Sequence, residues 1–309
     1  MRSQPGDLDR SPELEPALGR LRVWWMAIRP PTLTAAVVPV AVGTGVAFHD
    51  GVWAPLAAFA ALIGALALQA GANLANDLSD FRRGADTEAR LGPIRVTQRG
   101  LLSEREVTAG VIVFFAIATG FGLYLTFVGG WPIIAIGLAS MLAAVTYTGG
   151  PWPFGYRGLG ELFVFIFFGV VAVAGTYYVQ AGYVTADVLA ASVPVSLTVT
   201  AILVVNNVRD IDTDRLAGKY TLAVYLGRRL ARMEFVVVVA GAYLAAGALW
   251  ALGDFSGWVL LSWLSVPAAV LPVAVVLRRT DGPPLNQALK AMARLHLIFG
   301  LLLAIGLST

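Results

Sequence analysis

Nine stretches of about 20 apolar residues constrain the fold of this chain more than any other feature. A helix of about 20 residues crosses the hydrocarbon core of a bilayer and satisfies its own backbone hydrogen bonds there. Only 13% of the residues are charged and 58% are hydrophobic, which excludes an ordinary soluble domain. The sequence therefore predicts an all-α integral membrane protein with nine transmembrane helices. The stretches are 32–49, 53–76, 107–128, 132–148, 159–181, 187–208, 233–252, 257–277 and 288–307.

The basic residues provide an independent check on the number of spans. All 22 lie before the first stretch or in and around the connections after the second, fourth, sixth and eighth, and the alternate connections have none. Loops rich in Lys and Arg stay in the cytoplasm, so we predict a cytoplasmic N-terminus, an external C-terminus and an odd number of spans in the cell membrane. The net charge of +3 is explained by this topology, and no nucleic-acid partner is predicted.

The chain is predicted to form one membrane domain behind a short tail. Residues 1–20 carry charged residues and several prolines without an apolar core, so we predict a disordered cytoplasmic tail rather than a signal peptide. Residues 21–309 then form the transmembrane domain. The chain contains no cysteine, which excludes thiolate chemistry.

Two polar clusters stand at the ends of the second and sixth apolar stretches, in the segments 73–80 and 206–214. Both stretches are even-numbered, so they run in the same direction and bring their clusters to the cytoplasmic face. On a helix, the spacing places the Asn and Asp side chains of each segment along one face, whereas Asp212 points away from Asp210. Ionisable groups at a membrane boundary are costly unless they are neutralised, which points to a functional site.

The clusters offer oxygen ligands of the kind that Mg²⁺ prefers, and Mg²⁺ sites are commonly completed by substrate phosphates. We therefore predict a Mg²⁺-bound diphosphate between the two helices. The alternative is that these residues are helix ends and solvated loop charges. The predicted metal ligands are Asn73, Asn76, Asp77, Asp80, Asn206, Asp210 and Asp214.

Basic residues in the adjoining loops complement the acidic clusters. Arg95 and Lys219 lie close to glycines in the loops that follow the two clusters, where they can contact phosphate oxygens. The alternative for each is a topology determinant that contacts anionic lipid. We give that alternative role to Arg82, Arg83, Arg228 and Arg229.

Several ordered motifs together resemble the UbiA superfamily of intramembrane aromatic prenyltransferases, and within it the bacterial menaquinone branch, 1,4-dihydroxy-2-naphthoate polyprenyltransferase. The resemblance covers nearly the whole membrane part. The motifs are Arg29-Pro-Pro-Thr-Leu, Asn73-Leu-Ala-Asn-Asp77-Leu-Ser-Asp80, Gly92-Pro-Ile-Arg-Val-Thr-Gln98, Tyr147-Thr-Gly-Gly-Pro-Trp-Pro, Gly158-Leu-Gly-Glu161 and Asn206-Asn-Val-Arg-Asp-Ile-Asp-Thr-Asp214 with Ala217-Gly-Lys219.

The resemblance implies a UbiA-type bundle and a Mg²⁺-dependent reaction. A polyprenyl group would pass from polyprenyl diphosphate to 1,4-dihydroxy-2-naphthoate, with loss of CO₂ and diphosphate, to give demethylmenaquinone. The implied catalytic residues are Asp77, Asp80, Asp210, Asp214 and Lys219, and the diphosphate-binding residues are Arg95, Lys219, Gln98 and Arg209. Tyr147 and Glu161 are candidates for contact with the aromatic acceptor, with interfacial anchor and helix-end charge as the alternatives.

The first motif departs from the superfamily pattern, and the role of one aromatic run is open. The superfamily pattern Asn-x3-Asp-x3-Asp, counted from Asn76, reaches Asp80 and then Gly84, so the last carboxylate of the first motif is missing unless Asp86 replaces it. The aromatic run Phe163, Phe165, Phe167 and Phe168 is interpreted as lipid-facing, and the alternative is that it lines a channel for the prenyl tail.

Two other functions compete with this hypothesis. One is a UbiA-type prenyltransferase with a different aromatic acceptor. The other is a cation-coupled membrane transporter, whose paired acids would bind ions near the bilayer midplane. Both acidic clusters lie at one boundary beside basic loops, which suits an anion better than a permeating cation. The length of the prenyl chain and the oligomeric state are left open by the sequence.

Overall fold

The computed structural model describes residues 19–84, 91–92 and 95–309, and these residues form helices and connecting loops without a β-strand. The helices are α1 (Arg20–Ile28), η1 (Pro30–Leu33), α2 (Thr34–His49), α3 (Pro55–Arg82), α4 (Glu104–Gly129), α5 (Trp131–Thr146), η2 (Phe154–Arg157), α6 (Gly160–Val164), the π-helix η3 (Phe165–Val171), α7 (Ala172–Ala181), α8 (Ala186–Leu216), α9 (Leu222–Leu252), η4 (Gly257–Ser265), α10 (Val266–Arg278) and α11 (Gly282–Leu307). The predicted all-α fold is confirmed.

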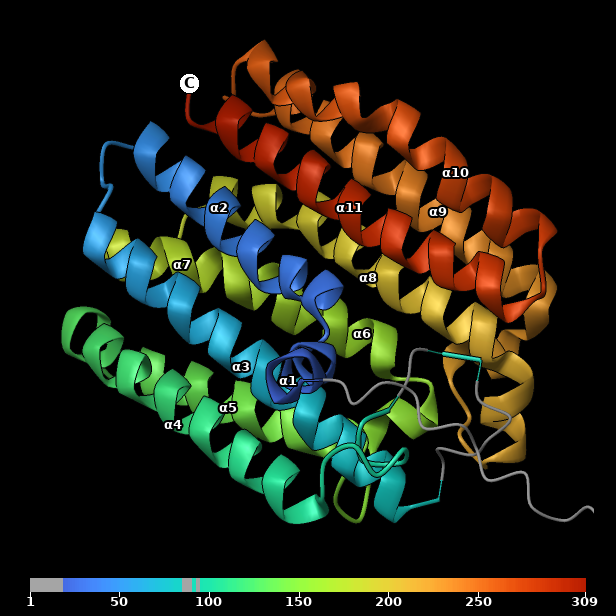
Figure 1. Cartoon of the computed structure of the whole chain (residues 1–309). Helices are drawn as coiled ribbons and strands as arrows, with labels where there is room; N and C mark the ends of the chain where they lie inside the picture. Colours follow the sequence, from blue (N-terminus) through green and yellow to red (C-terminus); the bar gives the residue numbers. More distant parts are fainter. Residues whose placement is uncertain (1–18, 85–90, 93–94) are drawn as a thin grey trace, which may run out of the picture.

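The long helices form one bundle with two sides (Figure 1). Helices α3, α4 and α5 pack together on one side, and α8, α9, α10 and α11 pack together on the other. Helices α2 and α7 lie between the two sides, since α2 contacts α3, α7, α8 and α11. The short helix α1 crosses one end of the bundle against α3.

Eight helical segments of the described chain are long and apolar enough to cross a membrane. The fourth predicted stretch, 132–148, forms the 16-residue helix Trp131–Thr146, which is shorter than these eight. Pro132 at its first turn and the Gly-Pro-rich segment after Tyr147 limit its length. A multi-helix membrane bundle is thus observed, whereas the count of nine spans stays a prediction.

The two helices that carry the polar clusters continue beyond the apolar stretches. Helix α3 ends at Arg82 and α8 at Leu216, so both clusters lie on the last turns of regular helices. The helical spacing assumed from the sequence is therefore confirmed. Gly84 follows the end of α3 with φ of 66°, a left-handed conformation that favours glycine. This helix end explains why no carboxylate stands at Gly84, and Asp86 lies outside the described residues.

The N-terminal part of the described chain contains one strained residue. Pro30 and Pro31 open η1 and separate α1 from α2. Arg29, immediately before them, has φ of 53° and is the non-glycine residue with positive φ among those described. The predicted tail falls mainly on residues 1–18, which lie outside the described residues, and its last residue, Arg20, begins α1.

Glycines allow close approach between helices of the bundle. In lipid, helices associate through van der Waals packing and polar contacts, so small residues at the contacts are favoured. A Cβ added at Gly45 of α2 would lie 2.5 Å from the Ala304 carbonyl oxygen of α11, and one added at Gly300 would lie 2.1 Å from Val38 Cγ1. Helices α2 and α11 are therefore held in contact along their length.

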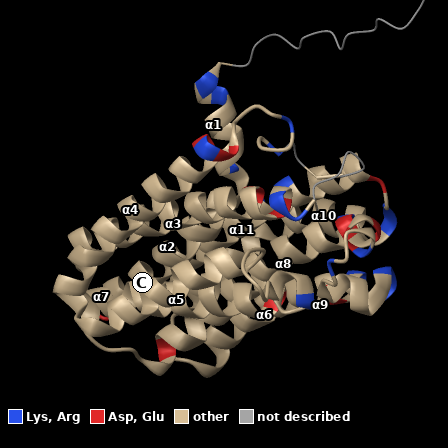
Figure 2. Ribbon diagram, turned by 90° about the horizontal axis from the view of Figure 1, so that it is seen from below, with Lys and Arg blue, Asp and Glu red and all other residues tan. Residues whose placement is uncertain are grey.

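Charged residues gather at one end of the bundle (Figure 2). The described Lys and Arg residues lie on α1, near the ends of α3, α8 and α10, at the starts of α4 and α9, in the first half of α11 and in the loops beside these segments. Both polar clusters belong to this end, because they occupy the C-terminal turns of α3 and α8. The opposite end of the described bundle carries little charge, in agreement with the distribution read from the sequence.

Candidate functional site

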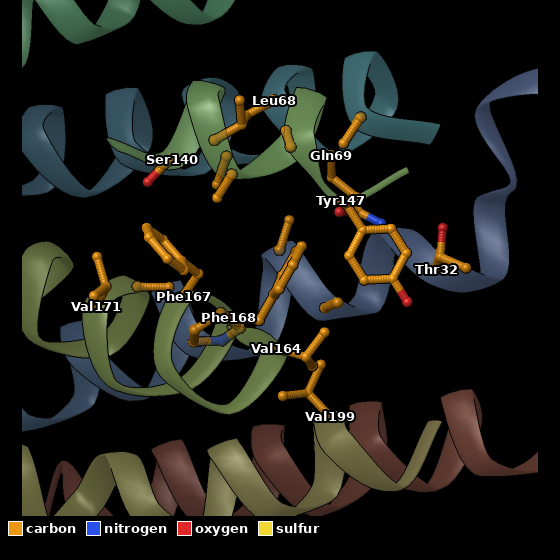
Figure 3. Close-up of a pocket in the computed structure, with 18 of the residues that line it drawn as sticks. Thr32, Leu68, Gln69, Ser140, Tyr147, Val164, Phe167, Phe168, Val171 and Val199 are labelled. Carbon is orange, nitrogen blue, oxygen red and sulfur yellow. The ribbon is translucent and has the colours of Figure 1, made fainter. Parts of the chain in front are cut away.

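A cavity of about 410 Å³ lies between the two sides of the bundle and joins the polar clusters to an apolar interior. Its polar end is lined by Asn73, Asn76 and Asp80 from α3, by Asn206 from α8, and by Arg29, Arg95 and Lys219. The rest is lined mainly by apolar residues of α2, α3, α5, η3 and α7, several of which appear in Figure 3. Both clusters therefore contribute to one cavity, as the sequence predicts.

Asp77 is buried, and hydrogen bonds and cations hold its carboxylate in place. Its side chain is 3% exposed, and Oδ2 accepts hydrogen bonds from the Thr97 backbone nitrogen at 3.2 Å and from the Thr97 hydroxyl at 2.7 Å. Oδ1 lies 3.6 Å from Arg95 Nη1 and 3.7 Å from Arg29 Nη2, and it accepts no hydrogen bond from the described residues. One carboxylate oxygen is thus engaged, while the other remains close to two cations.

Asp80 lies one turn further along α3, where both of its oxygens accept hydrogen bonds. Arg95 Nη2 donates to Oδ2 at 2.9 Å, and the Tyr156 hydroxyl donates to Oδ1 at 3.0 Å. The Arg95 side chain is only 7% exposed. One buried guanidinium therefore lies beside two buried carboxylates, as charge balance at a membrane boundary requires.

Asp210 on α8 is paired with its neighbour in sequence. Arg209 donates from Nε to Asp210 Oδ1 at 2.8 Å and from Nη2 to Oδ2 at 2.5 Å. The same guanidinium donates to the side-chain oxygens of Asn206 and Asn286, each at 2.8 Å. Arg209 is fully buried and does not line the cavity, so the structure places it behind Asp210 rather than among the residues that face a ligand.

Asp214 completes the second cluster and lies beside Lys219. The Lys219 amine is 3.5 Å from Asp214 Oδ1 and 5.6 Å from the centre of the Tyr156 ring, in a cation–π arrangement. Tyr156 in turn donates its hydroxyl to Asp80. Through this tyrosine, the structure brings the first and second clusters together.

Asp212 behaves as its helical position predicts. Its side chain is 73% exposed and pairs with Arg228 at 2.7 Å on the outside of the bundle. The sequence ranked it below Asp210 because the two point in opposite directions on α8. The structure bears out that ranking and places Arg228 with Asp212, away from the cavity.

The amide side chains of the first cluster are held by neighbouring segments. Asn73 donates from Nδ2 to the Ile28 carbonyl and to the Thr32 hydroxyl, both at 2.8 Å. Asn76 accepts a hydrogen bond at Oδ1 from the Thr148 hydroxyl at 3.1 Å. These contacts tie α3 to the segment before α2 and to the loop after α5, and they fix which atoms of each amide face the cavity.

Gln98 is a predicted diphosphate-binding residue that lies outside the cavity lining. It is half-buried in the turn after Arg95. Arg95 from the same motif does line the cavity. The structure thus brings Arg95 and Lys219 to the polar end, and it leaves Gln98 and Arg209 outside the lining.

The two candidates for contact with the acceptor differ in their position. Tyr147 lines the cavity, whereas Glu161 lies outside the lining with its carboxylate 6% exposed and Oε1 accepting a hydrogen bond from Asn207 Nδ2 at 2.7 Å. A phenol is protonated at neutral pH, so Tyr147 can donate a hydrogen bond to a ligand in the cavity.

The lipid-facing interpretation of the aromatic run is wrong for three of its four residues. Phe163, Phe167 and Phe168 line the cavity, and Phe154 stacks on Phe163 with ring centres 4.0 Å apart. The π-helical segment Phe165–Val171 has wider turns than an α-helix and so presents a broader face to the cavity. The periodicity of an ideal α-helix gave no sign of this broader face.

The donor set at the polar end fits a divalent cation that a ligand helps to hold. In the described part of the chain, no three carboxylate or imidazole groups converge on one point. The lining offers the Asp80 carboxylate and the Asn73 and Asn76 amides from α3 and the Asn206 amide from α8. Asp77, Asp210 and Asp214 lie beside this lining rather than in it, and Asp77 Oδ1 accepts no hydrogen bond from the described residues. Mg²⁺ usually keeps several waters and takes its remaining ligands from one or two carboxylates and from phosphate oxygens, and these residues fit that requirement.

Several residues of the site were missed by the sequence reasoning. Arg29 and Thr97 lie in motifs that were recognised, but no role was assigned to either. Tyr156 and Asn286 lie outside those motifs, and only the fold brings them to Asp80 and Arg209. The positive φ of Arg29 is uncommon for a non-glycine residue and is often found at functional sites, but the two prolines that follow do not predict this conformation.

Comparison with known proteins gives a consistent result over nearly the whole chain. The model of the UbiA prenyltransferase family matches residues 36–298. The 1,4-dihydroxy-2-naphthoate octaprenyltransferase of Escherichia coli K12 is 35% identical over 95% of this chain and 97% of that protein. The protein of the same description from Mycobacterium tuberculosis H37Rv is 38% identical over 91% of this chain and 95% of its own length.

The fold is also found among solved structures. A UbiA homolog from Archaeoglobus fulgidus, bound to GPP and Mg²⁺, superposes with a TM-score of 0.64 over 90% of this chain and 98% of that chain. Its sequence is 17% identical, so this similarity concerns the fold alone.

The charge balance around Arg95 leads to a test of stability. Replacing Arg95 by Met leaves Asp77 and Asp80 buried with less positive charge, and we expect a loss of about 3 kcal/mol in the free energy of unfolding without added metal. Thermal unfolding of the purified protein in detergent measures this loss. Arg82→Met is the matched control, because Arg82 pairs with Glu104 at a site where their side chains are 58% and 45% exposed. We expect a change within about 1 kcal/mol there, and equal losses in both variants would contradict the account.

Proposed function

The chain belongs to the UbiA prenyltransferase family, and we propose that it transfers a polyprenyl group from polyprenyl diphosphate to 1,4-dihydroxy-2-naphthoate. The naphthoate acceptor is the one named for the Escherichia coli and Mycobacterium tuberculosis relatives. The reaction releases diphosphate and CO₂. Because no oxidant takes part, the product leaves this step as the quinol form of demethylmenaquinone.

The single observation that carries this proposal is the division of one cavity into a charged end and an apolar interior. Asp80, Arg95 and Lys219 line the charged end, and Phe163, Phe167 and Val171 line the apolar part. A polyprenyl diphosphate has the same division, with an anionic head and a long hydrocarbon tail. A cation-coupled transporter has no need of an apolar channel that starts at its ion site.

The residues of the charged end have distinct roles in the proposal. Asp77, Asp80, Asp210 and Asp214, with Asn73, Asn76 and Asn206, would hold Mg²⁺ together with the diphosphate. When bound, Mg²⁺ neutralises the charge that develops on the leaving diphosphate. Arg95 and Lys219 line the same end and stabilise that charge directly, while Arg209 maintains the position of Asp210.

The transfer forms one carbon–carbon bond and breaks one carbon–oxygen bond and one carbon–carbon bond. The bond from C1 of the prenyl chain to the diphosphate oxygen breaks, and its electron pair leaves with the diphosphate. The electron-rich ring carbon that carries the carboxylate bonds to C1, and loss of CO₂ returns an electron pair to the ring. Phe163 and Phe167 line the cavity below the charged end, where their ring faces stabilise an allylic cation and exclude water.

The topology proposal follows from the distribution of charge. The cell membrane would contain nine spans, with the charged end of the cavity toward the cytoplasm, the N-terminus on that side and the C-terminus outside. The gathering of Lys and Arg at one end of the bundle supports this orientation. Donor and product are both lipids, so an opening in the plane of the membrane suits their exchange.

An assay of product formation tests the proposed reaction. Purified protein receives polyprenyl diphosphate and one acceptor from the set 1,4-dihydroxy-2-naphthoate, 4-hydroxybenzoate, homogentisate and haem, and mass spectrometry identifies the products. We expect prenylated product with release of CO₂ from the naphthoate only, and none after addition of EDTA. Product formation with one of the other acceptors alone would assign the protein a different acceptor within the same family. Undiminished turnover under EDTA would remove the metal from the account.

Replacement of single carboxylates tests the residues that we assign to the metal. We expect Asp77→Asn and Asp210→Asn each to lower kcat/KM on the order of 100-fold or more, because each removes a charge that would hold the metal and diphosphate. Asp212→Asn is the matched control on the same helix as Asp210, since Asp212 is 73% exposed and pairs with Arg228. Wild-type turnover in Asp77→Asn or Asp210→Asn would exclude that cluster from the reaction.

A further inference from the structure

Gln69 is a buried polar side chain inside the cavity for which the proposed reaction has so far assigned no role. It lies on α3, lines the cavity and is 8% exposed. Its side-chain oxygen, Oε1, accepts no hydrogen bond from the described residues. Figure 3 shows Gln69 together with Tyr147 and Thr32 in the lining of the cavity.

The position of Gln69 relates it to the metal ligands. Asn73, Asn76 and Asp80 follow at intervals of four, seven and eleven residues and line the same cavity, so all four side chains share one face of α3. With a rise of 1.5 Å per residue, Gln69 is about 6 Å deeper than Asn73 and about 16 Å deeper than Asp80. It therefore lies below the diphosphate end, at the level where the reacting end of the prenyl chain enters the apolar part.

An unpaired carbonyl oxygen in such a place indicates the chemistry of the missing partner. A buried polar atom without a hydrogen bond costs free energy, so in a ligand cavity it marks a position where the ligand supplies a hydrogen-bond donor. A prenyl tail has no donor. A diphosphate offers acceptor oxygens, and the cations that suit it lie at the other end of the α3 face. An aromatic acceptor with ring hydroxyls is the substrate that brings donors.

We infer that Gln69 Oε1 accepts a hydrogen bond from a ring hydroxyl of the aromatic acceptor, and that Gln69 thereby selects hydroxylated acceptors. This inference rests on the proposed function and adds a binding residue for the second substrate. A hydroxyl that donates to Oε1 releases electron density into the ring, which favours attack of the ring carbon on C1 of the prenyl chain.

Tyr147 complements Gln69 in this subsite. A phenol carries its proton at neutral pH, so Tyr147 offers a donor where Gln69 offers an acceptor. Tyr147 comes from the end of α5 and Gln69 from the middle of α3, and both line the cavity. A flat ring held between them meets an acceptor for its hydroxyl and a donor for an oxygen such as its carboxylate.

A binding experiment with paired ligands tests the inference. Isothermal titration without prenyl donor measures the affinity of the purified protein for 1,4-dihydroxy-2-naphthoate, kept anaerobic, and for 2-naphthoate, which lacks both hydroxyls. We expect the wild-type protein to bind the dihydroxy compound about tenfold more tightly than 2-naphthoate, the size of one good hydrogen bond in a buried site. Gln69→Leu should lose this preference, whereas Gln69→Glu should retain a preference because it keeps an oxygen acceptor.

Thr200→Val provides the matched control. The Thr200 hydroxyl is also buried without a hydrogen-bond partner among the described residues, but Thr200 does not line the cavity. Its replacement should leave the hydroxyl preference unchanged. The unfolding midpoint of Gln69→Leu without ligand should not fall below that of the wild type, because Oε1 makes no internal hydrogen bond to lose.

The outcomes separate this inference from the proposed function. A Gln69→Leu protein that still prefers the dihydroxy compound as strongly as the wild type overturns the role of Gln69, and product formation by the wild type then leaves the proposed function standing. A lower unfolding midpoint with an unchanged preference assigns Gln69 to the fold alone. A wild-type protein that makes no prenylated product overturns the proposed function itself.

Discussion

The burial of four carboxylates at one end of a membrane bundle is the constraint on which the rest of the site depends. Asp77, Asp80, Asp210 and Asp214 are all less than 10% exposed. Charges buried at such a boundary are tolerated only when opposite charges and hydrogen bonds surround them. Arg95 and Arg29 supply positive charge beside the first pair, and Arg209 and Lys219 supply it beside the second. Three of these cations, Arg29, Arg95 and Lys219, also line the cavity, where an anionic substrate would meet them.

This arrangement gives the cavity its direction. The carboxylates lie on the last turns of α3 and α8 with the cations beside them, and the apolar lining begins within about two turns of the carboxylates. An amphiphilic substrate is therefore held with its anionic head at the charged end and its tail among apolar side chains. The polar stripe along α3, from Asp80 to Gln69, runs from the anionic head toward the apolar part. In the proposed reaction, one helix face would thus bind the head and place the second substrate.

The sequence predicted the parts of the site that depend on the spacing of residues along one helix and on the distribution of charged loops. The helical spacing of Asn73, Asp77 and Asp80 placed them on one face, and the alternation of charged loops brought both clusters to one end. The roles of Tyr156 and Asn286 were not predictable in this way, because they depend on contacts between segments far apart in the chain. Arg209 was expected to bind diphosphate, but its guanidinium donates hydrogen bonds to Asp210, Asn206 and Asn286 instead. The spacing of residues on one helix gives no information about such partners.

The helix boundaries were also predicted only in part from the sequence. The predicted second and sixth stretches end at residues 76 and 208, because the polar residues that follow lower the mean hydropathy of the sequence there. Hydrogen bonding along the backbone continues to Arg82 and Leu216. The π-helical segment Phe165–Val171 packs closely against α8, where a Cβ at Gly169 would lie 1.7 Å from the Ser196 hydroxyl oxygen. Such close contacts are a property of the folded bundle.

The central claim is that carboxylates from both α3 and α8 hold one metal-bound diphosphate. A structure of the protein with Mn²⁺ and an unreactive prenyl thiodiphosphate, with the metal located by its anomalous scattering, tests this claim directly. We predict metal density on the order of 2 Å from carboxylate oxygens of both helices and from the same diphosphate. Metal bound to one helix only, or a diphosphate bound away from Arg95 and Lys219, would contradict the account.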